Sequence, residues 1–282
     1  VRGYYNKMVE NAKIAVEQGY NHMNILVYDN GMVANFENGQ LVRSYENIGA
    51  DANILRSLEL GSGMFLKLNN DYSIYKEGSL EYLLNVVKKY SREKPVLFFN
   101  QGAVCECEEQ FSTIDDIVLR EGWGMSWIGC YGYWKDDFDS WQNRDARQDT
   151  MFQQVDWFIR SYKKKRKIVY VQKRLTDRKE TISKQGGYDF IRVHTTNYFV
   201  QFEELVNEKL LKKTSLINLK KRVLSCMLSW ITKLKEDNGN KYSYEYNSPL
   251  IHLFTEYKMY PWFYIAIAKF EIKNILKSIK NR

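Results

Sequence analysis

Short apolar runs alternate with segments of helical periodicity in the first half of the chain, and this alternation limits the possible folds more than any other feature. The run Met23–Tyr28 predicts a strand, Asn47–Glu59 predicts a turn and a helix, and Met64–Leu68 predicts a second buried strand. A helix over 79–90 and a strand over 96–100 follow. Strands that alternate with helices usually pair in parallel, with the helices as crossovers. The sequence therefore predicts an α/β fold with a mostly parallel sheet.

The same patterns predict further elements along the chain. These are helices over 4–18, 111–120 and 149–164, strands over 41–45 and 167–171, a loop at Gly186–Gly187, and helices from 197 onward with a break over 237–249. The 282 residues, 44% hydrophobic and 27% charged, have the composition of a globular protein. That length allows one large domain, or one domain with an appendage.

The strand predicted over 64–68 ends on three polar residues, Asn69, Asn70 and Asp71. The carboxyl ends of parallel strands form the edge at which open α/β sheets bind ligands. An aspartate at this edge can hold a hard divalent cation, and through it a diphosphate. Asn and Asp also favour ordinary turns, so a plain strand exit explains the same three residues.

The positive charge is concentrated in the last part of the chain. Of the net +8, residues 205–282 carry 15 Lys and Arg against 6 Asp and Glu, a net +9, which leaves −1 for residues 1–204. The sequence therefore predicts a domain over 1–204 and a basic helical region over 205–282. Basic and apolar residues alternate there at helical spacing, which is typical of a helix lying on an anionic membrane surface. A helical cap packed on the domain explains half of the region equally well. The longest apolar run, Met259–Ala268, is too short to span a bilayer.

The cysteines and the charge pattern argue against two classes of protein, cysteine-based zinc proteins and nucleic-acid-binding proteins. Cys105 and Cys107 form a C-x-C pair, and no second pair follows at zinc spacing, so metal binding by them is not expected. Scattered thiols without a disulfide framework fit a reducing cytoplasm. The excess positive charge lies in amphipathic helices without a base-reading module, which argues against nucleic-acid binding.

Four segments in order resemble motifs of the family-2 glycosyltransferases. They are Ile25–Gly31, which ends in Asp-Asn-Gly; Glu46–Gly49 with the helix after it; Leu68–Asp71, where the family has its Asp-x-Asp motif; and Gln153–Arg160, similar to its Glu-Asp-x-Asp-Leu-x-x-Arg helix. The resemblance covers residues 2–200 and is closest to bacterial O-antigen and capsule enzymes of the abequosyltransferase type. It implies a GT-A fold, which is Rossmann-like, followed by the C-terminal helical appendage. It also implies transfer of a sugar from a nucleotide diphosphate to a glycan or lipid-linked glycan acceptor.

The chain departs from the family pattern at two points. The family opens with a strand and a nucleotide-holding turn, whereas this sequence opens at Val1, so we expect that it lacks its true start. The family's Glu-Asp pair appears here as Gln153-Gln154, which removes the carboxylates from the usual position of the catalytic base.

The resemblance implies catalytic and metal-binding roles for four residues. Asp71 is expected to bind Mn²⁺ or Mg²⁺, which would bridge the two phosphates and stabilise the leaving group. His194 is a candidate further ligand, although an ordinary loop or strand histidine explains it too. Asp156 is the candidate base of an inverting transfer, with Asp149 as its rival, and Asp149 could instead cap a helix.

Other residues are candidates for binding the two substrates. For the nucleotide these are Asp29, Asn47, Arg56, Asn69 and Asn70. A turn aspartate and a solvated helix face are the ordinary explanations of Asp29 and Arg56. Trp123 and Trp134 are candidate stacking surfaces for the acceptor sugar, with core packing as the alternative, and for Trp127 core packing is preferred.

The sequence as a whole thus predicts a metal-dependent nucleotide-sugar glycosyltransferase of bacterial surface polysaccharide synthesis. We expect it in the cytoplasm, peripherally associated with the inner face of the cell membrane through residues 205–282. Its expected partners are the donor, the acceptor and anionic lipid, and not nucleic acid. The alternative is a non-catalytic nucleotide- or sugar-binding relative, because Asn69-Asn70 and Gln153-Gln154 stand where the family has acids.

Overall fold

A computed structural model of the chain describes residues 25–29, 35–36, 39–43, 50–69, 73–100, 102, 105–178, 185–237, 239–245 and 249–280. The side chains of residues 25–43 are outside this description. The chain divides into two compact units, of which the first holds residues 1–120 and 124–183 and the second holds 121–123 and 184–282. The boundary at 183/184 comes earlier in the chain than the 204/205 boundary suggested by charge.

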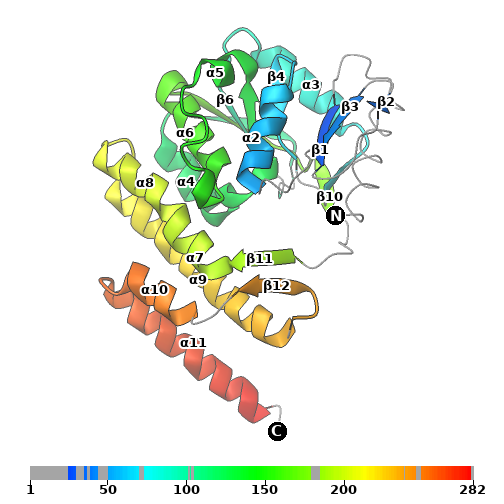
Figure 1. The fold of residues 1–282 in the computed structure, drawn as a ribbon. Helices are drawn as coiled ribbons and strands as arrows, with labels where there is room; N and C mark the ends of the chain where they lie inside the picture. Colours follow the sequence, from blue (N-terminus) through cyan, green and yellow to red (C-terminus); the bar gives the residue numbers. More distant parts are fainter. Residues whose placement is uncertain are drawn as a thin grey trace. The chain divides into compact units, whose positions relative to one another are not determined.

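The first unit alternates strands and helices (Figure 1). In chain order its elements are β1 (Ile25–Asp29), β2 (Asn35–Phe36), β3 (Gly39–Arg43), α2 (Ala50–Leu60), β4 (Phe65–Lys67), β5 (Ser73–Tyr75), α3 (Ser79–Tyr90), β6 (Val96–Asn100), β7 (Cys107–Phe111), α4 (Ile114–Glu121), η1 (Gly122–Ser126), η2 (Ile128–Cys130), β8 (Gly132–Trp134), α5 (Lys135–Ser140), η3 (Gln148–Thr150), α6 (Gln153–Lys165), β9 (Ile168–Gln172) and β10 (Thr176–Arg178). Helix α4 and the turn η1 each contain residues of both units.

The central strands of this unit form a mixed arrangement. β6 and β9 pair in parallel, whereas β7 pairs antiparallel with the other edge of β9. β4 pairs antiparallel with β8, and a single antiparallel bridge between Phe98 and Tyr131 joins β6 to the residue before β8. Both β4 and β6 are antiparallel to the segment that runs from Tyr131 into β8, and β6 is parallel to β9. The strands β4, β6 and β9 therefore run in the same direction. Their carboxyl ends therefore lie at one edge of the sheet.

Side chains that alternate along β6 and β9 build two apolar layers. Leu97 and Phe99 of β6 pack in a cluster with Leu83 and Val86 of α3. Phe98, the residue between them, contacts the ring of Phe158 in α6 instead. The sheet is thus covered by α3 on one face and by α6 on the other, which explains why β6 and β9 read as continuous apolar runs in the sequence.

The second unit is mainly helical (Figure 1). Its elements are β11 (Gln185–Asp189), α7 (Phe190–Arg192), the π-helical turn η4 (Val193–Asn197), α8 (Tyr198–Asn207), α9 (Lys213–Asp237), β12 (Tyr242–Glu245), α10 (Pro249–Tyr257) and α11 (Pro261–Lys280). Helix α9 supplies much of the core, since Leu219, Val223 and Met227 are almost completely buried. Tyr257 of α10 joins that core and donates a hydrogen bond to the carbonyl of Lys220 at 3.0 Å.

The structure corrects three expectations. The sheets are not mostly parallel, because β2, β4, β5 and β7 all make antiparallel pairs. The predicted loop at Gly186–Gly187 lies within β11, where Gly186 pairs with Ser243 of β12; a Cβ on Gly186 would come within 2.3 Å of the Ser243 backbone, so only glycine permits this approach. Helix α6 begins at Gln153 rather than at Asp149. The helix predicted over 4–18 lies outside the described residues.

Candidate functional site

Polar side chains collect at the sheet edge where β4, β6 and β9 end. Asn69 follows β4, Asn100 is the last residue of β6, and Gln172 is the last residue of β9. Asn100 and Gln172 are direct partners in the strand register. Asn69 lies at the same edge but is separated from Asn100 by the segment that leads into β8, because the N–H of its neighbour Leu68 donates to the carbonyl of Tyr131 at 3.1 Å and Tyr131 in turn bridges Phe98 of β6. We call this set the carboxyl edge.

The amides of the carboxyl edge are held in fixed orientations. The Asn100 side chain donates to the hydroxyl of Tyr170 and accepts the N–H of Gly102 at 2.7 Å. The Gln172 side chain donates to the carboxylate of Glu109. Amide groups anchored in this way can present hydrogen-bond donors and acceptors to a polar ligand without first having to be ordered.

A half-buried lysine lies beside the same edge. Lys67, the last residue of β4, directs its ammonium group to the carbonyls of Leu68 and Gly129, each at 2.6 Å. Burial lowers the pKa of Lys67 to about 7. The two carbonyls fix the strand exit that leads to Asn69, so Lys67 ties the start of this loop to the turn before β8.

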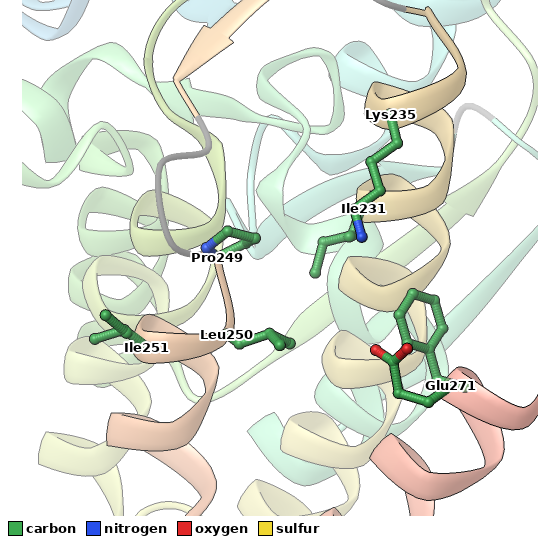
Figure 2. Close-up of a pocket in the computed structure, with 7 residues that line it drawn as sticks. Ile231, Lys235, Pro249, Leu250, Ile251 and Glu271 are labelled. Carbon is green, nitrogen blue, oxygen red and sulfur yellow. The ribbon is translucent and has the colours of Figure 1, made fainter. Parts of the chain in front are cut away.

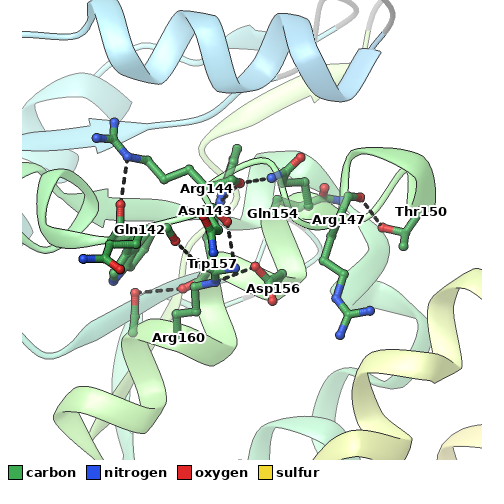
Figure 3. Close-up of polar contacts among 12 residues, drawn as sticks. Gln142, Asn143, Arg144, Arg147, Thr150, Gln154, Asp156, Trp157 and Arg160 are labelled. Atoms are coloured by element: carbon green, nitrogen blue, oxygen red, sulfur yellow. Dashed lines mark hydrogen bonds and ion pairs between the residues drawn. The ribbon is translucent and has the colours of Figure 1, made fainter.

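The loop over residues 141–152 is fastened to helix α6 (Figure 3). Arg160 forms an ion pair with Asp156 at 2.7 Å, and its other nitrogens donate to the carbonyls of Gln142 at 2.8 Å and Asn143 at 3.1 Å. Asp156, the expected base, thus orients the arginine that holds this loop. A base role for Asp156 stays a prediction, and this ion pair would have to open for it.

The side chains of Gln153 and Gln154 fasten two different segments to the start of α6, the loop over 141–152 and the turn η1. Gln153 donates to the carbonyl of Arg144, and so does the indole N–H of Trp157, at 3.0 Å. Gln154 donates to the carbonyl of Ser126 at 3.1 Å. Both glutamines are buried, at 0% and 3% exposure. An amide can donate to these carbonyls whereas a carboxylate cannot, which gives a structural reason for glutamine at both positions.

Asp51 is the residue that sequence reasoning missed. It lies in the first turn of α2, is only 5% exposed, and accepts the backbone N–H of Met151 at 2.8 Å. Burial raises the pKa of Asp51 to about 7, and the charge of Asp149 adds to the increase. A carboxyl with this pKa can exchange a proton near neutral pH. An acidic residue at the start of a helix is so common that the sequence alone gave no signal.

Asp149 and Arg56, two other candidates, are exposed. Asp149 lies in η3 beside Asp51 rather than in the helix predicted to start there. Arg56 lies on the surface of α2 and pairs with Glu59 at 3.8 Å. An arginine that pairs within its own helix fits the solvated-face explanation.

The remaining nucleotide and metal candidates are only partly described. Asp29 ends β1, as expected from the sequence, and Asn69 donates weakly to the carbonyl of Ser73 at 3.4 Å. Asn47, Asn70 and Asp71 lie outside the described residues. Within the described part of the chain, no group of three or more His, Cys, Asp and Glu side chains is arranged to hold a metal ion.

In the second unit the structure brings His194 and Trp123 together. Their rings meet edge to face with centroids 5.5 Å apart, and the ring of Phe190 lies 4.3 Å from that of His194. His194 is 8% exposed, and its Nδ1 lies 3.1 Å from the carbonyl of Phe190. Burial lowers the pKa of His194 to about 4, so the ring is neutral at neutral pH. This environment accounts for His194 as a packed aromatic residue; metal ligation by it stays a prediction.

The solvent exposure of Trp134 and Trp127 differs from what the sequence predicts. Trp134 is 3% exposed, donates its indole N–H to the carbonyl of Pro95 at 2.7 Å, and packs on Phe65, so its ring belongs to the core and not to an open acceptor surface. Trp127, for which core packing was preferred, is 41% exposed. It stands between the short turns η1 and η2, and much of its side chain is open to solvent.

An apolar pocket of about 290 Å³ opens in the second unit among α9, α10 and α11 (Figure 2). It is lined by Ile231, Lys235, Pro249, Leu250, Ile251, Phe270 and Glu271. Leu250 and Ile251 are 45% and 62% exposed, so the pocket is continuous with an apolar surface on α10. Among the described helices we find none whose length and hydropathy would let it cross a bilayer.

The chain was compared with known protein families and with characterised proteins. No protein-family profile matches the chain, and no characterised protein is significantly similar to it.

Proposed function

We propose that the protein is a nucleotide-sugar glycosyltransferase whose donor binds at the carboxyl edge. The single observation that carries this proposal is the common direction of β4, β6 and β9, which gathers Asn69, Asn100 and Gln172 at one edge of the sheet. This is the edge at which open α/β sheets bind ligands. The finer assignment to a GT-A fold is part of the proposal, and the resemblance of the sequence motifs supports it.

The chemistry of the edge suits a sugar nucleotide. Anchored amides such as those of Asn100 and Gln172 can bind ribose and sugar hydroxyls, because each offers both a donor and an acceptor. The strand exit continues as Asn70 and Asp71, and Asp71 would supply a carboxylate oxygen to Mg²⁺ or Mn²⁺. The metal would neutralise charge on the leaving diphosphate.

Proton transfer would fall to Asp51 and Asp149 in this proposal. The two carboxyls influence one another, and Asp51 has a pKa of about 7. Helix α6 leads into β9 through two residues only, so it runs back along the sheet and its first turn lies toward the carboxyl end of β9. The loop that carries Met151 and Asp149 precedes that first turn. In this proposal the two carboxyls therefore lie toward the donor edge.

Calorimetry with a panel of nucleoside diphosphates and Mn²⁺ tests the donor site. We expect saturable binding of one nucleotide that weakens at least about tenfold without Mn²⁺, a difference of about 1.4 kcal/mol. Asp71→Ala should remove the metal dependence without unfolding the protein. Asp139→Ala is the matched control, because Asp139 is an exposed acid of α5 that pairs with Lys135 on the same helix. Equal affinity of the Asp71 variant and the wild type in Mn²⁺ would contradict the proposed site.

A non-catalytic nucleotide-binding protein is the second candidate function. It is favoured by the buried amides of Gln153 and Gln154 and by the engagement of Asp156 with Arg160. The two functions differ in turnover. Binding of a nucleotide sugar without its hydrolysis, and without transfer to any lipid-linked or free glycan, would support the second function over the first.

We also propose that α11 docks on an anionic phospholipid surface. Four isoleucine and leucine side chains at 265, 272, 276 and 279 lie on one stripe of the helix and are each between 57% and 63% exposed. Lys269 and Lys273 are exposed beside this stripe. An apolar stripe flanked by lysines is the arrangement that lies in a membrane interface. The pocket between α9, α10 and α11 could accept part of a lipid chain.

Liposome sedimentation tests this docking. Vesicles with anionic lipid should bind the protein at low salt and release it at high salt, since each lysine near the surface contributes about 1 kcal/mol that salt screens. Ile272→Gln with Leu276→Gln should abolish binding and leave the fold intact, because both side chains are exposed. Leu119→Gln, an exposed leucine of α4, is the control. Deleting α9 is unsuitable because its buried side chains form the core of the unit. Failure of the wild type to sediment at low salt would refute the docking.

A further inference from the structure

Two thiols meet at the carboxyl edge. The Sγ atoms of Cys105 and Cys107 lie 3.3 Å apart, and both residues are exposed. A disulfide needs the sulfurs at about 2.05 Å, so they must approach by little more than about 1 Å. Cys105 lies in the connection from β6 to β7, and Cys107 is the first residue of β7. The described residues of this connection, Gly102, Cys105 and Glu106, are exposed, which allows a reagent to approach.

The surrounding charges decide between metal binding and disulfide formation. Each of the three glutamates in this segment already has its own cation. The pairs are Glu106–Lys173 at 2.7 Å, Glu108–Lys89 at 2.7 Å and Glu109–Arg120 at 3.3 Å. The carboxylates are therefore engaged, and a metal would have two thiolates as its protein ligands, fewer than a stable zinc site requires. The thiols contact each other, and Cys105 also contacts the Gln172 side chain at 3.6 Å.

We propose that Cys105 and Cys107 form a reversible intramolecular disulfide, and that this pair is a redox modification site at the carboxyl edge. The oxidant is a low-molecular-weight disulfide. One cysteine thiolate attacks a sulfur of the oxidant, which releases one small thiol and leaves a mixed disulfide. The second cysteine then attacks the protein sulfur and releases the second small thiol. The protein thereby gives two electrons and two protons to the oxidant.

The hydrogen bond between the thiols suggests the order of these two steps. It raises the pKa of Cys107, which therefore keeps its proton at a pH where a thiolate is needed for attack. Cys105 is then the attacking thiol and Cys107 the resolving one. Cys105 is also the thiol that contacts Gln172, so its oxidation removes a partner from a side chain of the carboxyl edge.

Thiol counting in glutathione redox buffers tests the proposal on the full chain. After quenching in acid and alkylation, we expect the free thiols to fall from four to two as the fraction of oxidised glutathione rises, and to return to four in reduced glutathione. The peptide that contains both cysteines should be lighter by the mass of two hydrogen atoms. Hydrogen exchange in β7 should slow in the oxidised protein, because the bridge restrains the start of that strand.

Two variants make the experiment decisive. Cys107→Ser should keep a glutathione adduct on Cys105 and form no bridge, while Cys226→Ser, a half-buried cysteine of α9, should still form the bridge. Glutathione adducts on both wild-type cysteines without a bridged peptide would overturn the proposal, and so would four free thiols in fully oxidised glutathione. These outcomes do not depend on the proposed donor site.

Discussion

Replacing Asp51 by asparagine should remove a large part of the pH dependence of folding in the first unit. Asp51 is 5% exposed and accepts the N–H of Met151 at 2.8 Å, a bond that the asparagine oxygen can keep. Its pKa is about 7 in the folded protein against 3.8 for an ordinary aspartate. A folded pKa above the unfolded one means that the folded state holds the proton more tightly. Stability therefore falls as the pH rises from about 4 to about 7 and is constant above that.

The size of the effect follows from these two values. Between about pH 5 and about pH 9 the carboxyl of the unfolded chain is ionised throughout. In the folded protein it keeps its proton from about pH 5 up to its pKa, a range of about two pH units. At about 1.4 kcal/mol per unit, Asp51 costs roughly 3 kcal/mol of folding free energy over this range. The asparagine in the Asp51→Asn variant has no charge to bury at either pH, so the variant is free of this cost.

Urea denaturation followed by tryptophan fluorescence, at about pH 5 and about pH 9, measures the difference. The change in unfolding free energy between the two pH values should be smaller by roughly 3 kcal/mol in Asp51→Asn than in the wild type. Asp139→Asn, on the surface of α5, leaves Asp51 untouched and serves as the control. Equal pH dependence in the wild type and Asp51→Asn would refute the assignment of a raised pKa to Asp51.

Three further changes test the packing described above. Gly132→Ala should lower the unfolding free energy by about 1–3 kcal/mol, because its Cβ would come within 2.5 Å of the Phe65 ring; denaturation measures this. Arg160→Gln should lower the unfolding free energy by about 1–3 kcal/mol, since it breaks the contacts to Asp156 and to the loop carbonyls. It should also speed proteolysis within residues 141–152, and an unchanged cleavage rate would contradict the role of Arg160 in holding this loop. His194→Phe should remove the contribution of His194 to acid destabilisation, roughly 3 kcal/mol between about pH 6.5 and about pH 4, because a lowered folded pKa makes protonation favour the unfolded state. The measurement is the difference in unfolding free energy between the variant and the wild type at these two pH values, followed by tryptophan fluorescence.

Local patterns determined those elements whose signals lie within one stretch of sequence. Helix α3 spans 79–90 and strand β6 spans 96–100, as the apolar spacing predicts, because each element is long enough to show its own period and is bounded by turn residues. The end of β1 at Asp29 was marked by the Asp-Asn-Gly turn in the same way. The polar residues Asn69 and Asp71, which follow the strand predicted over 64–68, also pointed to a ligand-binding edge of a sheet.

Tertiary structure alone decided the direction of the strands and the properties of the site. β8 is three residues long in a segment rich in glycine and aromatics, so no periodicity marks it, and its reversed direction follows from pairing with Phe65–Lys67 far along the chain. Trp134 is buried where its indole reaches the carbonyl of Pro95, whereas Trp127 stays exposed between two short turns. The pKa of Asp51 depends on burial and on Met151, a hundred positions away. Burial and charge are set by neighbours in space, and those neighbours come together only when the chain folds.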